Sequence, residues 1–550
     1  MAKSVEHIKA ESRHLRGSLY EEVFESLGGG VSEESRQLMK FFGMYLQDDR
    51  DQRRAKKEAG LGPEYSFMVR IALAGGRLTA DQYLAIDALS EEIGRGDFRL
   101  TSRQAIQVHG IAKRGLSPLV TRLHEVGTTT LAGCGDVERN IMACPAPGGI
   151  RDQVRAIAES LSRELQPRTR AYLELFVEGR KIYDIREDEP LYGDTYLPRK
   201  FKTGFAIEGD NCTDVLSDDI GIIAHGDPQG NLDSFTVMAG GGLGHCHGIA
   251  KTRAFLARAL GRVLPEDLEA VVKAIMTIQR DYGNREDRRY ARMKYLVDDW
   301  GIDVFRAEVE ARAAFTFLPP ILHRFDRPED HLGWHAEDRY LGLFVPEGRV
   351  AGTVRQALFE IVSAIKPDLC VTPQQNLLLL GIDEQQKAEA EQIWRDHGLS
   401  LAESLTPVRR ISMACVALPT CGLALAEAER VFPEVMRQFQ AEWARLGLAE
   451  EPILVRMTGC PNNCVRSEMA EIGFVGSSPG KYHLYLGGSP SGTRLADKFK
   501  ERIPLGALIP TVRPLLEWYA NERKPRQSFG DWAYEVGMNS LQQRLQEVVS

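Results

Sequence analysis

The sequence predicts an α+β protein of three domains in which two halves of the chain follow one plan. The segment GRLTADQYLAIDALSEEIGRGDFRLTSRQAIQVHGI, from Gly76, matches GRVAGTVRQALFEIVSAIKPDLCVTPQQNLLLLGI, from Gly348. Each reads as a strand, a turn, an amphipathic helix and a β-rich run that ends in Gly-Ile. Such a repeat indicates two halves packed around a pseudo-twofold axis. Strands and helices alternate elsewhere without a regular βαβ period, which favours α+β over a doubly wound sheet.

A chain of 550 residues is long enough for several hydrophobic cores. Proline and charge in LPPILHRFDRPED mark a connector within residues 310–335, and a second break is expected near residues 405–410. We expect the N-terminal 60 residues, which are charged and helical in periodicity, to wrap the core or to meet a partner protein. The predicted units are a wrapping segment over 1–63, the duplicated domain over 64–113 and 336–404, an anion-binding domain over 114–335, and a cysteine-bearing domain over 405–550.

Composition excludes two classes of protein. Charged residues make up 27% of the chain, and its net charge is -8, so it is no general binder of nucleic acids. The longest apolar stretch, residues 416–426, contains a proline and is too short to span a membrane. The N-terminus lacks the apolar core of a signal peptide. We therefore expect a cytoplasmic protein without nucleic-acid or membrane partners.

Four of the nine cysteines are grouped in the last third of the chain, at Cys415, Cys421, Cys460 and Cys464. Four thiolates suit either zinc or an iron-sulfur cluster. Structural zinc sites prefer two C-x2-C pairs, whereas these spacings are C-x5-C and C-x3-C, which favours a [4Fe-4S] cluster. Buried, inert thiols are the remaining interpretation. We expect Cys421 near a helix N-terminus and Cys464 one helical turn after Cys460.

The first half carries cations where the second half carries these thiols. The repeat extends to RNIMAC, ending at Cys144, and RISMAC, ending at Cys415. Lys200 and Lys202 are two residues apart, which places them on one face of a strand. The pattern indicates a site between the halves, with metal on one side and an anion on the other. The cations of the first half are Arg70, Arg99, Arg103, Arg139, Arg199, Lys200 and Lys202.

These motifs resemble a known family. ACVALPTC (414–421) with TGCPNNC (458–464) is similar to the cluster signature of the sirohaem-containing sulfite and nitrite reductases. Further segments resemble the haemoprotein (beta) subunit of the sulfite enzymes, over about residues 7–540 in all. They are FGMYLQDDRD (42–51), RLTSRQAIQVHG (99–110), TYLPRKFKT (195–203), AGGGLG (239–244), QRDYGNREDRR (279–289) and LGGSPSGTRL (486–495).

The resemblance implies two ferredoxin-like halves and two sirohaem/iron-sulfur α/β domains, with sirohaem and a [4Fe-4S] cluster as cofactors. It implies that Cys464 is shared by the cluster and the sirohaem iron, while the other three cysteines hold the cluster alone. Arg70, Arg139, Lys200 and Lys202 would form the catalytic pocket for the anion. Because sirohaem carries eight carboxylates, further cations are expected around it, and the candidates are Arg99, Arg103, Arg285, Arg288 and Arg292.

The implied reaction is the assimilatory six-electron reduction of sulfite to sulfide. Nitrite enzymes tend to carry asparagine at the position of Lys202, so this lysine favours sulfite. The segment RIALAGG has Ala72 and Ala74 where the family usually has the arginine and proline of RCRLPGG, and the consequence of this difference stays open.

The chain contains no strand-GxGxxG-helix fingerprint, so its electrons must come from another protein. We expect an NADPH-dependent flavoprotein subunit as the donor. The alternatives are a ferredoxin-dependent sulfite reductase, a nitrite reductase of the same family, and a non-enzymatic protein with a structural iron-sulfur cluster.

Overall fold

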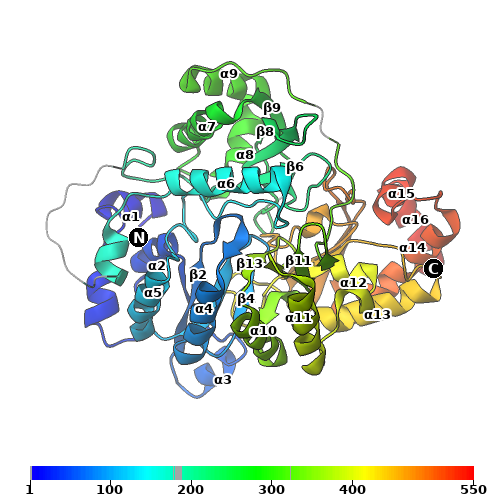
Figure 1. The fold of residues 1–550 in the computed structure, drawn as a ribbon, viewed down its shortest axis with the longest axis horizontal. Coiled ribbons are helices and arrows are strands. Elements are labelled where there is room, and N and C mark those ends of the chain that lie inside the picture. The colour runs from blue at the N-terminus through cyan, green and yellow to red at the C-terminus, as the bar shows by residue number, and fades with distance from the viewer. Residues whose placement is uncertain (1–2, 178, 180–188, 250, 322–323, 550) are drawn as a thin grey trace.

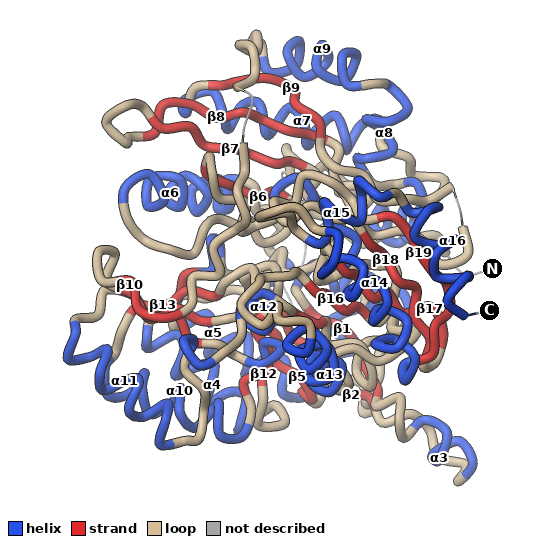
Figure 2. The backbone as a smooth tube through the Cα atoms, turned by 90° about the vertical axis from the view of Figure 1, so that its right-hand side faces the viewer, coloured by secondary structure: helices blue, strands red, loops and turns tan. Residues whose placement is uncertain are grey.

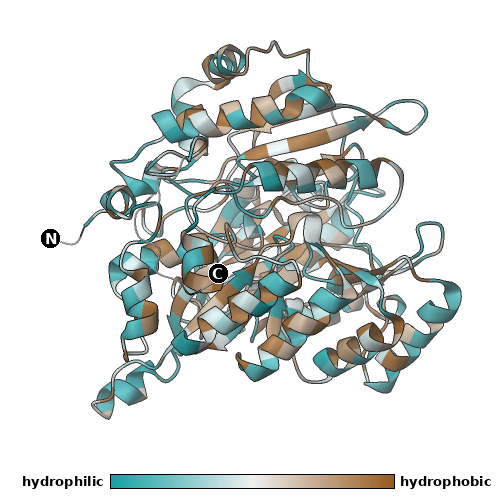
Figure 3. Ribbon diagram, turned by 60° about the vertical axis from the view of Figure 1, so that its left-hand side comes forward, coloured by the Kyte–Doolittle hydropathy of each residue, from teal (hydrophilic) through white to brown (hydrophobic). Residues whose placement is uncertain are grey.

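The computed structural model describes residues 3–177, 179, 189–249, 251–321 and 324–549 (Figure 1). Residues 322 and 323, in the expected connector, lie outside the described residues. Among the described residues, no helix is both long and apolar enough to cross a bilayer. Figure 3 shows that many helices carry both hydrophilic and hydrophobic residues along their length, as expected for amphipathic helices.

Each copy of the repeat contains a strand, a short strand, a helix and two further strands, whereas the sequence predicted a strand, a turn, an amphipathic helix and one β-rich run. The helices begin where the sequence supplies caps or a glycine. Thr79 and Gln82, for example, form a capping box at the start of the first helix, whose Tyr83, Ile86 and Leu89 are buried. The first copy consists of β2 (Tyr65–Ile71), β3 (Arg77–Leu78), α4 (Ala80–Glu92), β4 (Phe98–Leu100) and β5 (Ile106–Ile111); the second consists of β11 (Tyr340–Leu343), β12 (Arg349–Val350), α10 (Gly352–Ile365), β13 (Asp368–Val371) and β14 (Leu377–Leu380).

The two copies exchange their short strands. One sheet has the order β1-β2-β5-β4-β12, with β1 at Met44–Asp48; the other has the order β10-β11-β14-β13-β3, with β10 at Gly333–His335. Thus β12 of the second copy pairs with β4 of the first, and β3 of the first pairs with β13 of the second. Helix α10 packs against both α4 and α11 (Glu384–Asp396), and the three helices lie in the lower part of Figure 1. Each half is therefore completed by the other.

Two more sheets flank this core (Figure 2). The sheet of β6 to β9 is accompanied by α6 to α9, and the sheet of β15 to β19 by α12 to α16. Residues from Val408 to Leu545 form a hydrophobic core of their own around the second sheet. The strands are β6 (Thr203–Ile207), β7 (Ile220–Gly226), β8 (Leu232–Ala239), β9 (Arg258–Val263), β15 (Met413–Ala414), β16 (Val455–Thr458), β17 (Ile472–Ser478), β18 (Lys481–Leu486) and β19 (Asp497–Pro504).

The helices around these sheets are mostly amphipathic and close over the buried strands. Those of the first flanking unit are α6 (Gly149–Glu164), α7 (Leu268–Tyr282), α8 (Met293–Trp300) and α9 (Ile302–Ala313). Those of the second are α12 (Pro407–Ile411), α13 (Phe432–Arg445), α14 (Leu508–Glu522), α15 (Phe529–Val536) and α16 (Met538–Val549).

The two flanking units also repeat one another. In each, two parallel strands are joined through a short 3-10 turn that follows a residue in the left-handed region, Asp214 (φ 53°) or Arg466 (φ 58°). One constant offset along the chain relates β6 to β16, the first turn to the second, and β7 to β17. The same offset relates Cys212 to Cys464. The duplication thus extends beyond the segments in which sequence similarity is visible.

The N-terminal segment packs on the rest of the chain. The fully buried ammonium of Lys9 donates to the carbonyl of Leu197 at 2.7 Å and contacts the Asp136 carboxylate at 3.5 Å. This buried contact anchors the first helix. The helices at this end of the chain are α1 (Val5–Glu11), α2 (Glu33–Met39), α3 (Arg53–Glu58) and α5 (Leu116–Glu125).

Candidate functional site

The four grouped cysteines are brought together by two neighbouring parallel strands. Cys415 follows β15 directly, and Cys460 follows β16 after one residue. Because the strands are parallel, with Ala414 opposite Met457, their carboxyl ends meet at one edge of the sheet. The loop after β15 also carries Cys421, and the loop after β16 carries Cys464. The sheet therefore presents all four thiols at one edge.

Gly459 allows the two cysteine loops to touch. Its carbonyl accepts from the N–H groups of Leu425 and Ala426 at 2.8 and 3.0 Å, and its own N–H donates to the sulfur of Cys415 at 3.2 Å. A Cβ at this position would lie 2.6 Å from the Cβ of Ala417 and 2.6 Å from the Ala426 oxygen. Only glycine fits such an approach of two backbones.

The helical positions expected for the cysteines were wrong. Cys421 lies in a turn well before α13, which begins at Phe432, and residues 460–464 form turns, with Asn463 in the left-handed region (φ 58°). Pro461, Asn462 and Asn463 are turn formers, and this local preference prevails over a helix. The turn directs the Asn462 amide to the sulfur of Cys460 at 3.4 Å.

The four thiols fit a cluster better than a single ion. Burial raises the pKa of Cys415 to about 11 and that of Cys460 to about 12, and the charge of Cys464 adds to both shifts. Stable thiolates here therefore need a cationic centre. A tetrahedral zinc ion brings its sulfurs within about 4 Å of one another. Among the described residues, no three of these four sulfurs lie within 4.8 Å of each other. Cys464 is the exposed member of the four.

Two arginines of the predicted pocket are held by one carbonyl. Arg70, on β2, donates to the Gly133 oxygen at 3.2 Å and to the sulfur of Cys134 at 2.5 Å. Arg139 donates to the same oxygen from Nε and Nη2, at 3.0 and 2.7 Å. The shared acceptor sets the positions of both guanidinium groups.

Three further cations have no partner in the described part of the chain. Arg199, Lys200 and Lys202 are partly buried, yet they form no hydrogen bond or ion pair through their side chains. Burial lowers the pKa of Lys202 to about 7, and the charge of Arg103 adds to the shift. Burial likewise lowers the pKa of Lys200, with Arg199 and Lys202 adding to the shift and the charge of Cys464 opposing it. Lys200 therefore lies within electrostatic range of the cysteine site.

The five arginines proposed for the macrocycle all have internal partners. Arg103 pairs with Asp218 at 2.6 Å, Arg288 with Asp136 at 2.8 Å, and Arg292 with Asp219 at 2.7 Å. The same arginines act electrostatically on the unpaired lysines or on Arg199. They therefore lie within electrostatic range of the unpaired cations.

Arg99 and Arg285 have contacts of a different kind. Arg99 is 2% exposed, pairs with Glu429 and donates to the Ala414 carbonyl at 2.7 Å. Arg285 pairs with Glu6 of the N-terminal helix and donates to the Tyr196 carbonyl at 2.6 Å. These contacts hold parts of the chain together, which favours a structural role for both residues.

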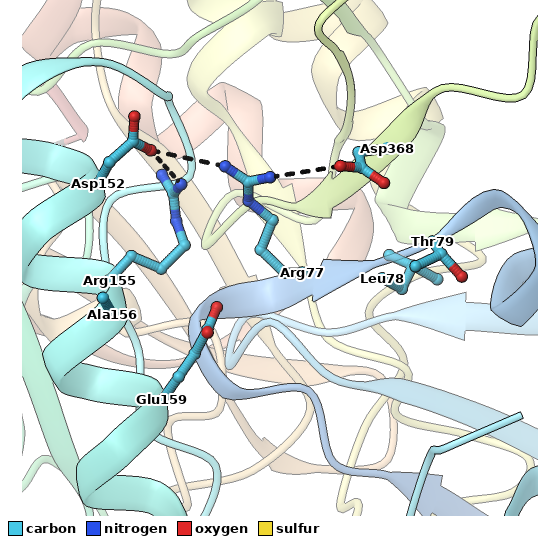
Figure 4. Close-up of a pocket in the computed structure, with 8 residues that line it drawn as sticks. All are labelled: Arg77, Leu78, Thr79, Asp152, Arg155, Ala156, Glu159 and Asp368. Atoms are coloured by element: carbon cyan, nitrogen blue, oxygen red, sulfur yellow. Dashed lines mark hydrogen bonds and ion pairs between the residues drawn. The ribbon is translucent and has the colours of Figure 1, made fainter.

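The pocket in Figure 4 is separate from these residues. Arg77 pairs across it with Asp152 at 3.6 Å and with Asp368 at 3.8 Å. None of the candidate residues lines it; its lining residues are Arg77, Leu78, Thr79, Asp152, Arg155, Ala156, Glu159 and Asp368.

Comparison with known families identifies the kind of domain that contains the four cysteines. Residues 134–317 and 408–550 match the family described as the nitrite and sulphite reductase 4Fe-4S domain, and residues 61–126 match the nitrite/sulfite reductase ferredoxin-like half domain. The chain belongs to the nitrite and sulfite reductase family. The resemblance read from the motifs is confirmed, as is an α+β fold with a ferredoxin-like half domain and 4Fe-4S domains.

Relatives within this family match the chain almost from end to end. The sulfite reductase [NADPH] hemoprotein beta-component of Staphylococcus saprophyticus is 41% identical, over 97% of this chain and 95% of that protein. The protein of the same name from Paenibacillus sp. is 39% identical over the same shares. The structure of Mycobacterium tuberculosis NirA has the same fold, with a TM-score of 0.79 and 23% identity over 97% of this chain and 95% of that one.

Sequence reasoning missed several groups that support the site of this reductase family member. Arg50 donates to the carbonyls of Cys421 and Ala424 at 3.1 and 2.6 Å, and the Ser102 hydroxyl donates to the Cys464 carbonyl at 2.7 Å. Arg50 lies in the motif FGMYLQDDRD and Ser102 in RLTSRQAIQVHG, so these two motifs could have pointed to them. The acidic partners Asp136, Asp218 and Asp219 carried no such signal, because an isolated aspartate has no distinctive pattern.

Proposed function

We propose that this chain is the haemoprotein component of an assimilatory, NADPH-dependent sulfite reductase. The observation that carries the proposal is a set of unpaired, partly buried cations at Arg199, Lys200 and Lys202; of these, Lys200 interacts electrostatically with the exposed thiol Cys464 of the four-cysteine group. Unpaired buried cations are costly unless an anion completes the site. Sulfite and the carboxylates of sirohaem are such anions.

The residues present fit both cofactors. Cys415, Cys421 and Cys460 would hold a [4Fe-4S] cluster together with Cys464, and Cys464 would also bind the sirohaem iron. Its exposure suits a shared ligand. Bound there, the coupled cofactors supply electrons to the sulfur atom of the substrate. Arg103, Arg288 and Arg292 would act with the unpaired cations on the carboxylates of the macrocycle, whereas Arg99 and Arg285 fit this role less well because of their structural contacts.

The pocket residues have distinct tasks in this proposal. Arg70 and Arg139, both fixed by the Gly133 carbonyl, would orient the oxygens of sulfite through charge-assisted hydrogen bonds. Each S–O bond that breaks releases water and so consumes protons. Lys200 and Lys202 would donate them, since a donor whose pKa lies near neutral pH transfers protons best. The pKa of Lys202 is about 7.

The charge of the pocket favours sulfite over nitrite. Sulfite is a dianion at neutral to alkaline pH, whereas nitrite is a monoanion, and a second lysine stabilises the larger charge more. The relatives that match the chain end to end are named as NADPH-dependent components. We therefore propose a flavoprotein as the electron donor, with ferredoxin as the second candidate. An assay that supplies either reduced ferredoxin or an NADPH-flavoprotein pair separates the two.

The visible spectrum of the purified protein tests the proposal against a structural iron-sulfur protein. A reductase shows a Soret band and a band in the red from sirohaem, whereas a structural cluster protein is plain brown. Cys464→Ser should remove the sirohaem bands, because the shared ligand is lost. Cys370→Ser, which changes a buried thiol outside the group, should keep them. A purified protein without sirohaem bands under conditions of sirohaem supply would refute the proposed function.

A further inference from the structure

We propose that Cys144, Asp210, Cys212 and His331 bind a structural zinc ion. One sulfur, nitrogen or oxygen atom from each of these residues lies within 4.8 Å of all the others. In the described part of the chain this is the only such group of three or more cysteine, histidine or acidic residues. It does not depend on the proposed function, because none of its members belongs to the cluster or the anion pocket.

The distances between the four side chains match tetrahedral coordination. The sulfur of Cys144 lies 3.5 Å from Oδ2 of Asp210 and 3.7 Å from Nε2 of His331, and these two atoms are 3.7 Å apart. Tetrahedral zinc, with Zn–S near 2.3 Å and Zn–N or Zn–O near 2.1 Å, separates such atoms by about 3.5 Å. An ion at the centre would therefore need only small shifts of the side chains.

His331 is oriented as a ligand. Its Nε2 faces Cys144 and Asp210, while Nδ1 is buried, forms no hydrogen bond with a described residue and lies 3.7 Å from Oε2 of Glu329. Zinc-bound histidines commonly turn their second nitrogen to a carboxylate in this way. The backbone of His331 lies in the left-handed region (φ 58°), which a non-glycine residue rarely adopts. A metal bond would compensate for that conformation.

The surroundings favour a metal over a solvated group of polar residues. Cys144 and Cys212 are 2% and 1% exposed, and His331 is fully buried. The two cysteines pack in a small apolar cluster with Ala146, Tyr340, Leu378 and Leu380. Two thiols, an imidazole and one carboxylate form a soft, mixed ligand set that suits zinc in such a setting.

The position of the site in the fold gives the ion a task. Cys144 corresponds to the cluster cysteine Cys415 in the repeat, and Cys212 corresponds to Cys464 through the offset between β6 and β16. The proposed ion thus occupies the place in the first unit that the cluster occupies in the second. Because His331 lies at the end of the connector between the halves, the ion would tie this connector to the loop that follows β6.

The direct test measures zinc in the purified holoenzyme. Elemental analysis should find about one zinc per chain, and X-ray absorption at the zinc edge should show two sulfurs near 2.3 Å and two lighter atoms near 2.0 Å. Neither measurement needs a variant, so a folding defect cannot obscure the result. Sirohaem and the cluster contain iron, so their occupancy is read separately and a failure of the proposed function would not affect the zinc signal.

Variants then assign the ligands. Cys144→Ser, Cys212→Ser and His331→Ala should each lower the zinc content at least tenfold while iron per chain stays unchanged. Cys370→Ser is the matched control, because Cys370 is a fully buried thiol in the same apolar cluster but outside the four ligands, and it should retain zinc. Absence of zinc from the wild-type protein, or a Cys144–Cys212 disulfide found by mass spectrometry under non-reducing conditions, would overturn the proposal.

Discussion

The surroundings of Lys202 lower its pKa toward neutral pH, which suits a proton donor. It has no ion-pair partner in the described part of the chain, it is partly buried, and cations such as Arg103 and Arg292 act on it. Burial and these charges favour release of its proton near neutral pH. An ordinary surface lysine would hold its proton too tightly to act as a donor at that pH.

Replacing Lys202 with asparagine should separate the two candidate substrates. Loss of the proton donor and of one positive charge should lower kcat/KM for sulfite about 100-fold. For the monoanion nitrite we expect a loss below about tenfold, because less charge has to be compensated. Assays with an artificial electron donor measure both values. The exposed Lys57, replaced in the same way, serves as a control. Equal losses for both substrates would remove the basis for preferring sulfite.

The pH dependence of sulfite reduction should reflect the same lysine. Lys202 is protonated below its pKa of about 7 and neutral above it, so kcat/KM, which reports the free enzyme, should fall as the pH rises through about 7. In Lys202→Arg the side chain stays charged at every pH of the assay. We expect this variant to be slower overall, and its kcat/KM should no longer show the decrease near pH 7 that comes from deprotonation of Lys202. The ionisation of sulfite affects both proteins equally. Identical profile shapes would exclude Lys202 as the titrating group.

At the scale of elements, the cysteine site depends on two loops rather than on helices. The strands β15 and β16 place the loops side by side, and Gly459 sets how closely they approach. Sequence patterns identified the four cysteines because their spacing is distinctive. They gave the wrong local structure, since the proline after Cys460 suits the first turn of a helix as well as a tight turn.

Gly459→Ala should prevent cluster assembly. The added methyl group would lie 2.6 Å from Ala417 and from the Ala426 carbonyl, so the loops would have to separate. We expect iron per chain and the cluster absorbance to fall at least tenfold. Gly422→Ala is the matched control, because this glycine follows Cys421 but has no atom within 4 Å of an added Cβ. If the cluster is retained in Gly459→Ala, the close approach of the loops is not required.

At the scale of the whole molecule, the exchanged strands join the two halves into one cooperative unit. Gly348 precedes β12, with φ at +72°, and an added Cβ would lie 2.5 Å from the Leu100 carbonyl of the other half. The equivalent Gly76, at φ +81°, approaches the Val371 carbonyl in the same manner. Each exchanged strand is thus preceded by a glycine at the point where the halves meet.

Gly348→Ala should loosen both halves together. Hydrogen exchange should accelerate in β4 of the first half and in β13 of the second half, and the variant should be about 2 kcal/mol less stable than Gly381→Ala because of the steric contact. Gly381 is a fitting control, since its φ of +68° imposes a similar backbone cost while an added Cβ meets open space. Faster exchange in β4 alone would show that the halves open independently.

The sequence predicted those features of the architecture that depend on short continuous segments. The repeated strand, turn and helix patterns predicted the duplication, and the cysteine and arginine motifs predicted the family, which the comparisons confirm. Strand exchange could not be predicted, because the pairing of Val350 with Phe98 joins distant segments and leaves no local pattern. The pairing of Arg103 with Asp218 is long-range in the same way. The roles of the individual pocket residues and the electron donor remain predictions.

The exchange of β3 and β12 also limits how such a gene can be rearranged. If the polypeptide is cut between the two halves, the first fragment lacks the edge strand β12 and its own β3 has no pairing partner. The second fragment lacks β3, and its β12 has no pairing partner. Neither fragment can complete its five-stranded sheet alone, because the missing edge strand belongs to the other fragment. Two separately translated halves could therefore assemble into the complete fold. Deleting one half, or joining one half to an unrelated domain, would leave a sheet without its edge strand.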